Sequence, residues 1–150
     1  MKSNNGFTLI ELLAVIVILA IIALIAAPII VGLIDDARRE SAANSAYGVY
    51  HSAENVYAKV LIANKSGLPA DIIYTFSTSG ISIGYGDETT NTPPTEWGIE
   101  ATDATLDFKG TMPTDGKLIL NNEGDVTVSK ALTINNYTCT MGTNDIFTCN

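Results

Sequence analysis

The chain has 150 residues, of which 47% are hydrophobic and 16% are charged, with 16 acidic residues against 8 Lys and Arg. This length suits one domain, or one domain with an appendage, and the high hydrophobic content excludes intrinsic disorder of the whole chain. The net charge of -8 argues against a protein whose bulk surface follows the phosphates of nucleic acids, so we expect no direct nucleic-acid binding.

The charged residues are unevenly distributed along the chain. The first 34 residues contain only Lys2 and Glu11 as charged groups, and residues 12–34 are 23 consecutive uncharged positions. A helix of that length spans about 35 Å, which is enough to cross a hydrocarbon core of ~30 Å. A secretory signal peptide is the alternative, but its apolar region covers only about 7–15 residues, and the sequence before Pro28 makes a poor cleavage site. The segment therefore predicts a transmembrane helix, whose orientation the flanking charges leave open.

Glu11 is the unusual residue of this segment. A carboxylate near the end of an apolar helix is costly unless water or a partner group compensates its charge. Only four residues separate Glu11 from the hydrophilic residues 1–6. On physical grounds alone, contact with water at the level of the lipid headgroups explains it.

The residues around Glu11 also form a motif. Residues 6–13 read Gly-Phe-Thr-Leu-Ile-Glu-Leu-Leu, after a short polar leader with one lysine and before the apolar run. This arrangement resembles the prepilin processing site of type IV pilins and type II secretion pseudopilins. Pro28 lies where those families commonly place a helix-kinking proline. The resemblance covers the first third of the chain and indicates the superfamily, not the member.

The resemblance implies how the precursor is processed and assembled. A membrane prepilin peptidase would cleave between Gly6 and Phe7 and methylate the new amino group of Phe7. Glu11 would then pair with the terminal amine of a neighbouring subunit, and breaking such a pair should cost several kcal/mol. The implied partners are further copies of the chain, a pilus assembly platform with its ATPase, and membrane lipid before assembly. No cofactor and no metal are implied.

Pro28 also has a physical consequence of its own. It removes one backbone donor from the helix and obstructs the carbonyl of Leu24, so we expect a kink at this point.

Residues 35–67 predict a continuation of the same helix with an amphipathic pattern. Apolar and small residues recur every three to four positions, and Gly67 with Pro69 fits the end of the helix. Among the aromatic residues, Tyr47, Tyr50 and Tyr57 predict packing of this helix against a sheet. His51, the single histidine, has no Cys or acidic pair at ligand spacing, so we expect it at a surface or an interface.

Residues 68–150 change character and predict a β-rich head. Short β-like runs lie between Thr, Asn, Gly and Asp residues, and residues 117–128 have the pattern of a hairpin with a glycine-containing turn. The candidate strands cover residues 72–76, 81–85, 105–109, 117–120, 126–129 and 132–134, and the strongest loop covers residues 84–94. The expected fold is α+β, with a small, mostly antiparallel sheet packed on the second half of a long amino-terminal helix, as in type IV pilins.

Cys139 and Cys149 are the only cysteines. Two ligands without a nearby histidine do not make a zinc site. We expect a disulfide, since the head should lie outside the membrane, where oxidation is allowed. Closing a loop of about ten residues stabilises a protein by roughly 2.5–3 kcal/mol. Pilins often carry such a carboxyl-terminal disulfide loop, so the pair also fits the resemblance.

The sequence contains no motif of a hydrolase, metalloprotease, nucleotide-binding or dinucleotide-binding enzyme, so we expect no enzymatic function. Two acidic pairs, Asp87 with Glu88 and Glu100 with Asp103, lack the spacing of a calcium loop, and we interpret them as solvated loop residues.

These features predict four segments. They are a cleaved leader (1–6), a transmembrane and filament-core helix (7–34), an amphipathic helix on the head (35–67) and the head with its disulfide loop (68–150). The favoured function is a type IV pilin, made in the cytoplasmic membrane and polymerised into a surface filament for adhesion, motility or aggregation. A pseudopilin of a secretion or DNA-uptake system is the alternative. A membrane-anchored sensor or enzyme ectodomain would need a ligand-binding or catalytic cluster, and the sequence shows none.

Overall fold

The computed structural model describes residues 6–64, 67–86 and 92–150. Its first element, α1, is one helix of 56 residues, Leu9–Asn64. The chain divides into two compact units, Met1–Ala37 and Arg38–Asn150, so that α1 contributes to both. The two units are described separately below.

The first unit consists of the apolar part of α1. The helix begins at Leu9 and continues through Pro28 without interruption. Its large apolar side chains are exposed all round, from Leu9 at 82% to Ile34 at 45%. Such a helix needs cover from outside the chain, because water around so many Leu, Ile and Val side chains is unfavourable. The bend at Pro28 stays a prediction.

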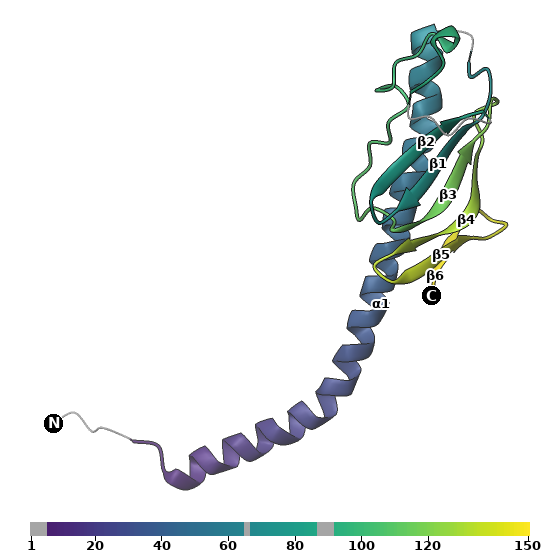
Figure 1. Ribbon diagram of the computed structural model, residues 1–150. Helices are drawn as coiled ribbons and strands as arrows, with labels where there is room; N and C mark the ends of the chain where they lie inside the picture. The colour runs from purple at the N-terminus through teal and green to yellow at the C-terminus, as the bar shows by residue number, and fades with distance from the viewer. Residues whose placement is uncertain (1–5, 65–66, 87–91) are drawn as a thin grey trace. The chain divides into compact units, whose positions relative to one another are not determined.

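The second unit is a helix packed on a six-stranded sheet (Figure 1). The strands in chain order are β1 (Ile72–Ser77), β2 (Gly80–Tyr85), β3 (Asp115–Leu120), β4 (Val126–Ile134), β5 (Tyr137–Met141) and β6 (Phe147–Cys149). Their order across the sheet is β2-β1-β3-β4-β5-β6, and every neighbouring pair is antiparallel. The α+β prediction, a long helix followed by an antiparallel sheet, is confirmed.

The core of this unit follows from two periodicities. On α1, small residues three to four positions apart are fully buried: Ala42, Ala46, Val49, Ala53, Val56 and Val60. On β1, alternate residues face the helix, with Ile72, Tyr74 and Phe76 buried at 1% exposure or less. Small side chains on the helix leave room for large ones on the sheet, so the two surfaces interlock at close range. Tyr47, Tyr50 and Tyr57 pack against this core from its margin, as the sequence predicts.

The connection from β2 to β3 contains a short 3-10 helix, η1 (Thr95–Trp97), and then a segment without regular structure. Residues 105–109, expected as a strand, are not one. Leu106 and Phe108 do point towards the core, which explains their alternating pattern. However, this segment lies along α1, where a Cβ on Gly48 would be 2.9 Å from the carbonyl oxygen of Lys109. A segment beside a helix has no strand to pair with.

The end of the sheet also differs from the expectation. The two candidate strands at 126–129 and 132–134 are one strand, β4, whose register against β3 shifts near Lys117 and Lys130. A bulge of this kind interrupts the alternation of side chains, so the sequence pattern reads as two strands. Strands β5 and β6 were not expected. Thr and Asn dominate their surroundings, and in the register of the pair Cys139 lies opposite Cys149.

Candidate processing and assembly site

The site expected at the amino terminus is formed by four residues at the start of α1. Gly6, Phe7 and Thr8 precede the first helical residue and have no regular secondary structure. Phe7 is 89% exposed. The bond between Gly6 and Phe7 therefore lies in accessible, non-helical backbone, which is the form in which a peptidase can bind it. The rest of the leader, including Lys2, lies outside the described residues.

Packing does not explain why residue 6 is glycine. A Cβ on Gly6 would meet no atom within 4 Å among the described residues. A larger side chain would therefore fit here without a steric clash with those residues.

Thr8 and Glu11 cap the first turn of α1. The Thr8 backbone N–H and hydroxyl both donate to Oε2 of Glu11, at 2.8 and 2.7 Å. In return, the Glu11 N–H donates to Oγ1 of Thr8 at 3.3 Å. This is a capping box, which satisfies otherwise unpaired donors at the start of a helix. Thr8 was missed as a site residue, although Thr followed by Glu three positions later is the sequence signature of this cap.

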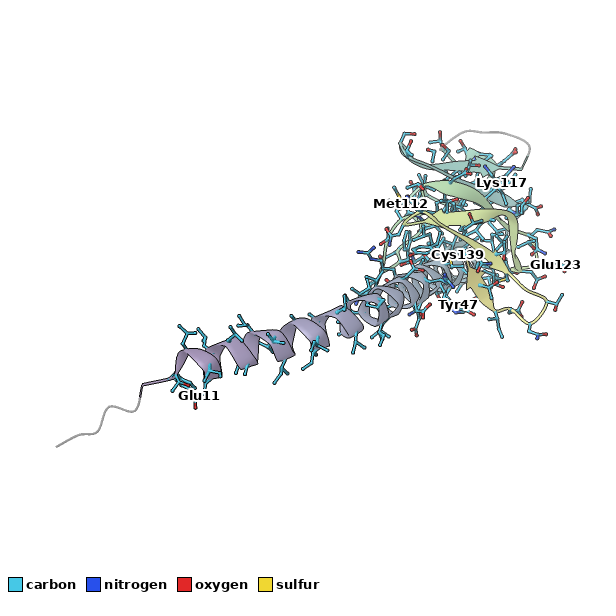
Figure 2. All side chains as sticks on the ribbon, turned by 90° about the horizontal axis from the view of Figure 1, so that it is seen from below. Glu11, Tyr47, Met112, Lys117, Glu123 and Cys139 are labelled. Atoms are coloured by element: carbon cyan, nitrogen blue, oxygen red, sulfur yellow. A yellow bond between two sulfur atoms is a disulfide. The ribbon has the colours of Figure 1, made fainter. Side chains whose placement is uncertain are left out.

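The cap leaves part of the Glu11 carboxylate available. Both bonds from Thr8 go to Oε2, and among the described residues nothing donates to Oε1. Figure 2 shows the Glu11 side chain at the beginning of the apolar helix. One oxygen is thus held by its own chain while the other can accept a hydrogen bond from a second group.

The helix that follows meets the requirements of a membrane span by length and composition. Its most apolar window has a mean hydropathy of 3.3, and none of that window is buried inside the structure. Pro28 is part of this segment. Together, the exposed Gly6–Phe7 bond, the Glu11 carboxylate and a largely exposed apolar helix lie within the first 34 residues.

The second expected feature is at the other end of the chain. Cys139 and Cys149 form a disulfide that joins β5 to β6. Both cysteines are buried, and Figure 2 shows Cys139 within the sheet. The Phe147 N–H of this edge strand donates to the hydroxyl of Tyr47 on α1 at 2.9 Å. The helix thereby occupies a backbone donor that an edge strand would otherwise expose to other chains.

His51 lies in an aromatic group on the flank of α1. Its ring contacts those of Tyr47 and Tyr50, and its Nδ1 is 2.7 Å from Oε2 of Glu54. Burial raises the pKa of the Tyr50 phenol, and the nearby carboxylates of Glu54, Asp145 and Asp125 raise it further. The His51 side chain is 62% exposed, which fits a surface position.

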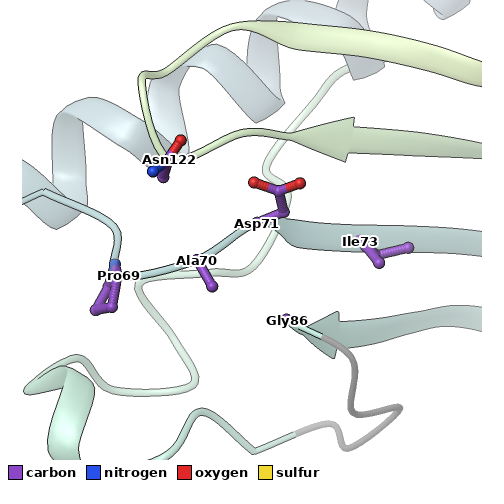
Figure 3. Close-up of a pocket in the computed structure, with 6 residues that line it drawn as sticks. All are labelled: Pro69, Ala70, Asp71, Ile73, Gly86 and Asn122. Atoms are coloured by element: carbon purple, nitrogen blue, oxygen red, sulfur yellow. The ribbon is translucent and has the colours of Figure 1, made fainter.

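Among the described residues, the remaining acidic groups form no cluster that could hold a metal ion. Asp103 accepts a hydrogen bond from the Glu100 N–H, so that it closes a turn, and Asp87 and Glu88 lie outside the described residues. Figure 3 shows a pocket of about 410 Å³ at the start of β1, where Asp71 is the only titratable group among the described lining residues. The Asp71 carbonyl accepts a hydrogen bond from the Gly86 N–H. A single carboxylate does not make a catalytic centre.

A comparison with known protein families identifies the amino-terminal motif. Residues 1–27 match the family model described as the prokaryotic N-terminal methylation motif. The chain has a type IV pilin-like or pseudopilin-like amino terminus. The motif is typical of those proteins, and it implies processing by prepilin peptidase, a membrane-anchored precursor and assembly into a pilus-like polymer. No curated protein and no solved structure matched the chain.

Proposed function

We propose that the chain is a type IV pilin, a structural subunit that is stored in the cytoplasmic membrane and then polymerised into a surface filament. The observation that carries this proposal is the start of α1, where an exposed Gly6–Phe7 bond, the Glu11 carboxylate and an uncovered apolar helix follow one another within a few turns.

Cleavage after Gly6 would create the group that Glu11 needs. The new terminal amine of Phe7 is positively charged at neutral pH. In a filament, the amine of one subunit would reach Oε1 of Glu11 in the next, while Oε2 keeps its bonds to Thr8. A paired charge is far less costly in an apolar environment than a lone one, so the pairing also fixes the axial register of the subunits.

The exposed apolar segment would serve in two environments. In the precursor, lipid surrounds the helix, and in the filament the helices of other copies do. Both environments favour side chains that are apolar on every face, as residues 12–34 are. The assembly platform and its ATPase would supply the work of moving the subunit from one environment to the other.

The alternative is a pseudopilin of a secretion or DNA-uptake system, which would use the same amino-terminal residues. Two observations favour a pilin. The head carries a disulfide between Cys139 and Cys149, and its acidic composition opposes direct DNA binding.

Mass spectrometry and electron microscopy test the proposal in sequence. The intact mass of the protein from its native host should correspond to residues 7–150 with one added methyl group. A protein that keeps Met1 to Gly6 would refute the processing step. Electron microscopy of the host with and without the gene then separates the two functions, because a pilin accounts for long surface filaments, whereas a pseudopilin leaves the cell surface unchanged and impairs secretion or DNA uptake.

A further inference from the structure

A polar hollow of about 630 Å³ lies within the second unit, where β4 turns into β5. Its lining residues are Arg38, Asn135, Asn136 and Tyr137. Asn135 and Asn136 have φ values of 52° and 70°, as the central residues of a two-residue hairpin turn require. The hollow therefore combines a guanidinium group from α1, two side-chain amides and an aromatic ring, a set of groups suited to a carboxylate with an apolar neighbour.

Arg38 is a cation without an ion-pair partner among the described residues. In the head, Lys130 pairs with Asp115 at 2.6 Å and the His51 ring lies 2.7 Å from Glu54, whereas Arg38 has no comparable contact among the described residues. The chain has twice as many acidic as basic residues, so an unpaired arginine is not explained by a shortage of carboxylates. A partner from outside the chain would complete this pairing.

The loop between β5 and β6 has the complementary chemistry. Ile146 is an apolar side chain that is 54% exposed, and beside it Asp145 is held at a φ of 56°. The turn is closed by hydrogen bonds from Gly142 N–H to the Ile146 carbonyl and from Asp145 N–H to the Gly142 carbonyl, at 2.9 and 3.2 Å. The disulfide at Cys139 and Cys149 joins the two strands that carry this loop. The loop thus presents a carboxylate and an apolar side chain on a rigid support.

We propose that the Asp145–Ile146 tip of one copy docks into the Arg38 hollow of a second copy. Asp145 then pairs with the Arg38 guanidinium, and Ile146 packs on the ring of Tyr137. The two surfaces are different parts of the same chain, so each copy can offer both at once. A contact of this kind adds copies in one direction and builds open filaments. The inference rests on the proposed function, because it names a head contact for the same polymer.

Lipid phosphate is the competing occupant, since Arg38 follows Ile34, the end of the uncharged apolar run, by only four positions. Two observations favour a second copy. Asp35 and Asp36 lie three and two positions before Arg38, and their charges oppose an anionic membrane surface. An exposed isoleucine beside a carboxylate matches a protein surface better than a headgroup region.

Charge reversal in the full-length protein, produced in its host, tests the proposal. Arg38→Asp and Asp145→Arg should each lower the amount of filament sheared from the cells by about tenfold or more, because each places like charges opposite one another. The double variant should recover to within about threefold of the native amount, since the pair is restored with its signs exchanged. Lys117→Asp is the matched control for Arg38→Asp. It makes the same change in net charge on the outer side of β3, and this variant should assemble normally.

Each outcome has a separate meaning. Native filament yield from Arg38→Asp would overturn the head contact, while the mature mass of the same sample still tests the proposed function. Loss in both single variants without recovery in the double variant would also overturn it, and would point to lipid phosphate or another carboxylate at Arg38. The melting temperature of each purified variant shows whether its head has folded.

A photocrosslinking residue at position 146 provides a second measurement. In intact filaments, the proposal predicts a covalent dimer whose crosslinked peptide contains Tyr137. A dimer crosslinked elsewhere, or no dimer in fully formed filaments, would refute the docking of Ile146.

Discussion

The two ends of α1 differ in what covers them, although they belong to one helix. Residues 12–34 are mostly Leu, Ile and Val, and their large side chains are exposed. Between residues 42 and 60, the buried positions are Ala, Val and two Ser, covered by the rest of the head. Large side chains suit an environment supplied by lipid or other copies, whereas small ones suit a fixed sheet at close range. The first segment therefore needs cover from outside the chain, whereas the second is covered when the head folds.

Glu11→Val should have the largest predicted effect. It should impair filament assembly and leave the folded head intact. The substitution removes the proposed partner of the Phe7 amine, so filament yield should fall below detection, since leaving one charge of such a pair alone costs about 3–5 kcal/mol. Membrane insertion and the melting temperature of the head should not change. Sheared filaments, membrane fractions and thermal unfolding measure the three quantities.

Two further variants at this site serve as controls. Glu11→Gln keeps an oxygen that can accept from Thr8 but loses the charge, and it should also fail to assemble. Thr8→Val keeps the charge and loses the cap, which costs about 1 kcal/mol, so most filaments should remain. Normal assembly of the Gln variant would show that the charge is not required.

Gly124→Ala should act on the other region, by destabilising the folded head. Gly124 has a φ of 101°, and a Cβ there would lie 2.5 Å from Cδ1 of Tyr57. The clash and the backbone strain should together lower the free energy of unfolding of the head by about 2–4 kcal/mol. Insertion of the apolar helix into the membrane should not change. Denaturant unfolding of the head measures the effect.

Gly142→Ala is the matched control for this substitution. The nearest atom to a Cβ on Gly142, the carbonyl oxygen of Ile146, is 3.6 Å away, an ordinary contact. Its stability should therefore stay within about 0.5 kcal/mol of the native head. Equal effects at both glycines would mean that the contact with Tyr57 is not the cause.

Removal of the disulfide should have a slightly smaller effect on the head. The double substitution Cys139→Ser and Cys149→Ser opens a loop with a sequence separation of 10, which predicts a loss of roughly 2.5–3 kcal/mol. Reduction of the native protein should give a comparable loss, measured by denaturant unfolding with and without a thiol reagent. A head of unchanged stability would show that the β5–β6 pairing does not need the bond.

The comparison of the two regions also shows what a sequence can predict. The apolar run, Glu11 and the motif after Gly6 are local features, so the sequence was sufficient to locate the first segment and its candidate site. Even the missed cap at Thr8 is a local pattern. The hairpin after Lys117 was predicted for the same reason, since Asn121 organises the turn through its own side chain, with Oδ1 accepting from the N–H groups of Glu123 and Asp125.

The errors lie where a partner distant in sequence decides the structure. Residues 105–109 have a strand-like alternation, but they lie beside Gly48 on α1 and not beside a strand. Strands β5 and β6 pair with each other and are joined by the disulfide, and β6 bonds to Tyr47, 100 residues away along the chain. A short polar strand carries too weak a pattern to reveal a partner at that separation.

The smallest effects on stability are predicted for two tyrosines within the core of the head. The Tyr74 hydroxyl donates to the carbonyl of Ala104 at 2.8 Å, whereas the buried Tyr85 hydroxyl has no hydrogen-bond partner among the described residues. Tyr74→Phe should therefore cost about 1–1.5 kcal/mol, because it leaves the Ala104 carbonyl unpaired. Tyr85→Phe should be neutral or slightly stabilising, since it removes a polar group that burial already penalises. Denaturant unfolding of both variants gives the comparison.

The same pair predicts how the head responds to alkali. Burial raises the pKa of Tyr74 far above its usual value, with a further contribution from Tyr85, and burial also raises that of Tyr85. Because the folded state disfavours the phenolates, this contribution to stability is complete below about pH 10, the ordinary pKa of tyrosine, and is lost as the pH rises above it. Tyr74→Phe should flatten the decline in stability above pH 10. An equally steep decline in that variant would assign the alkaline loss to groups outside the contact between β1 and the Ala104 segment.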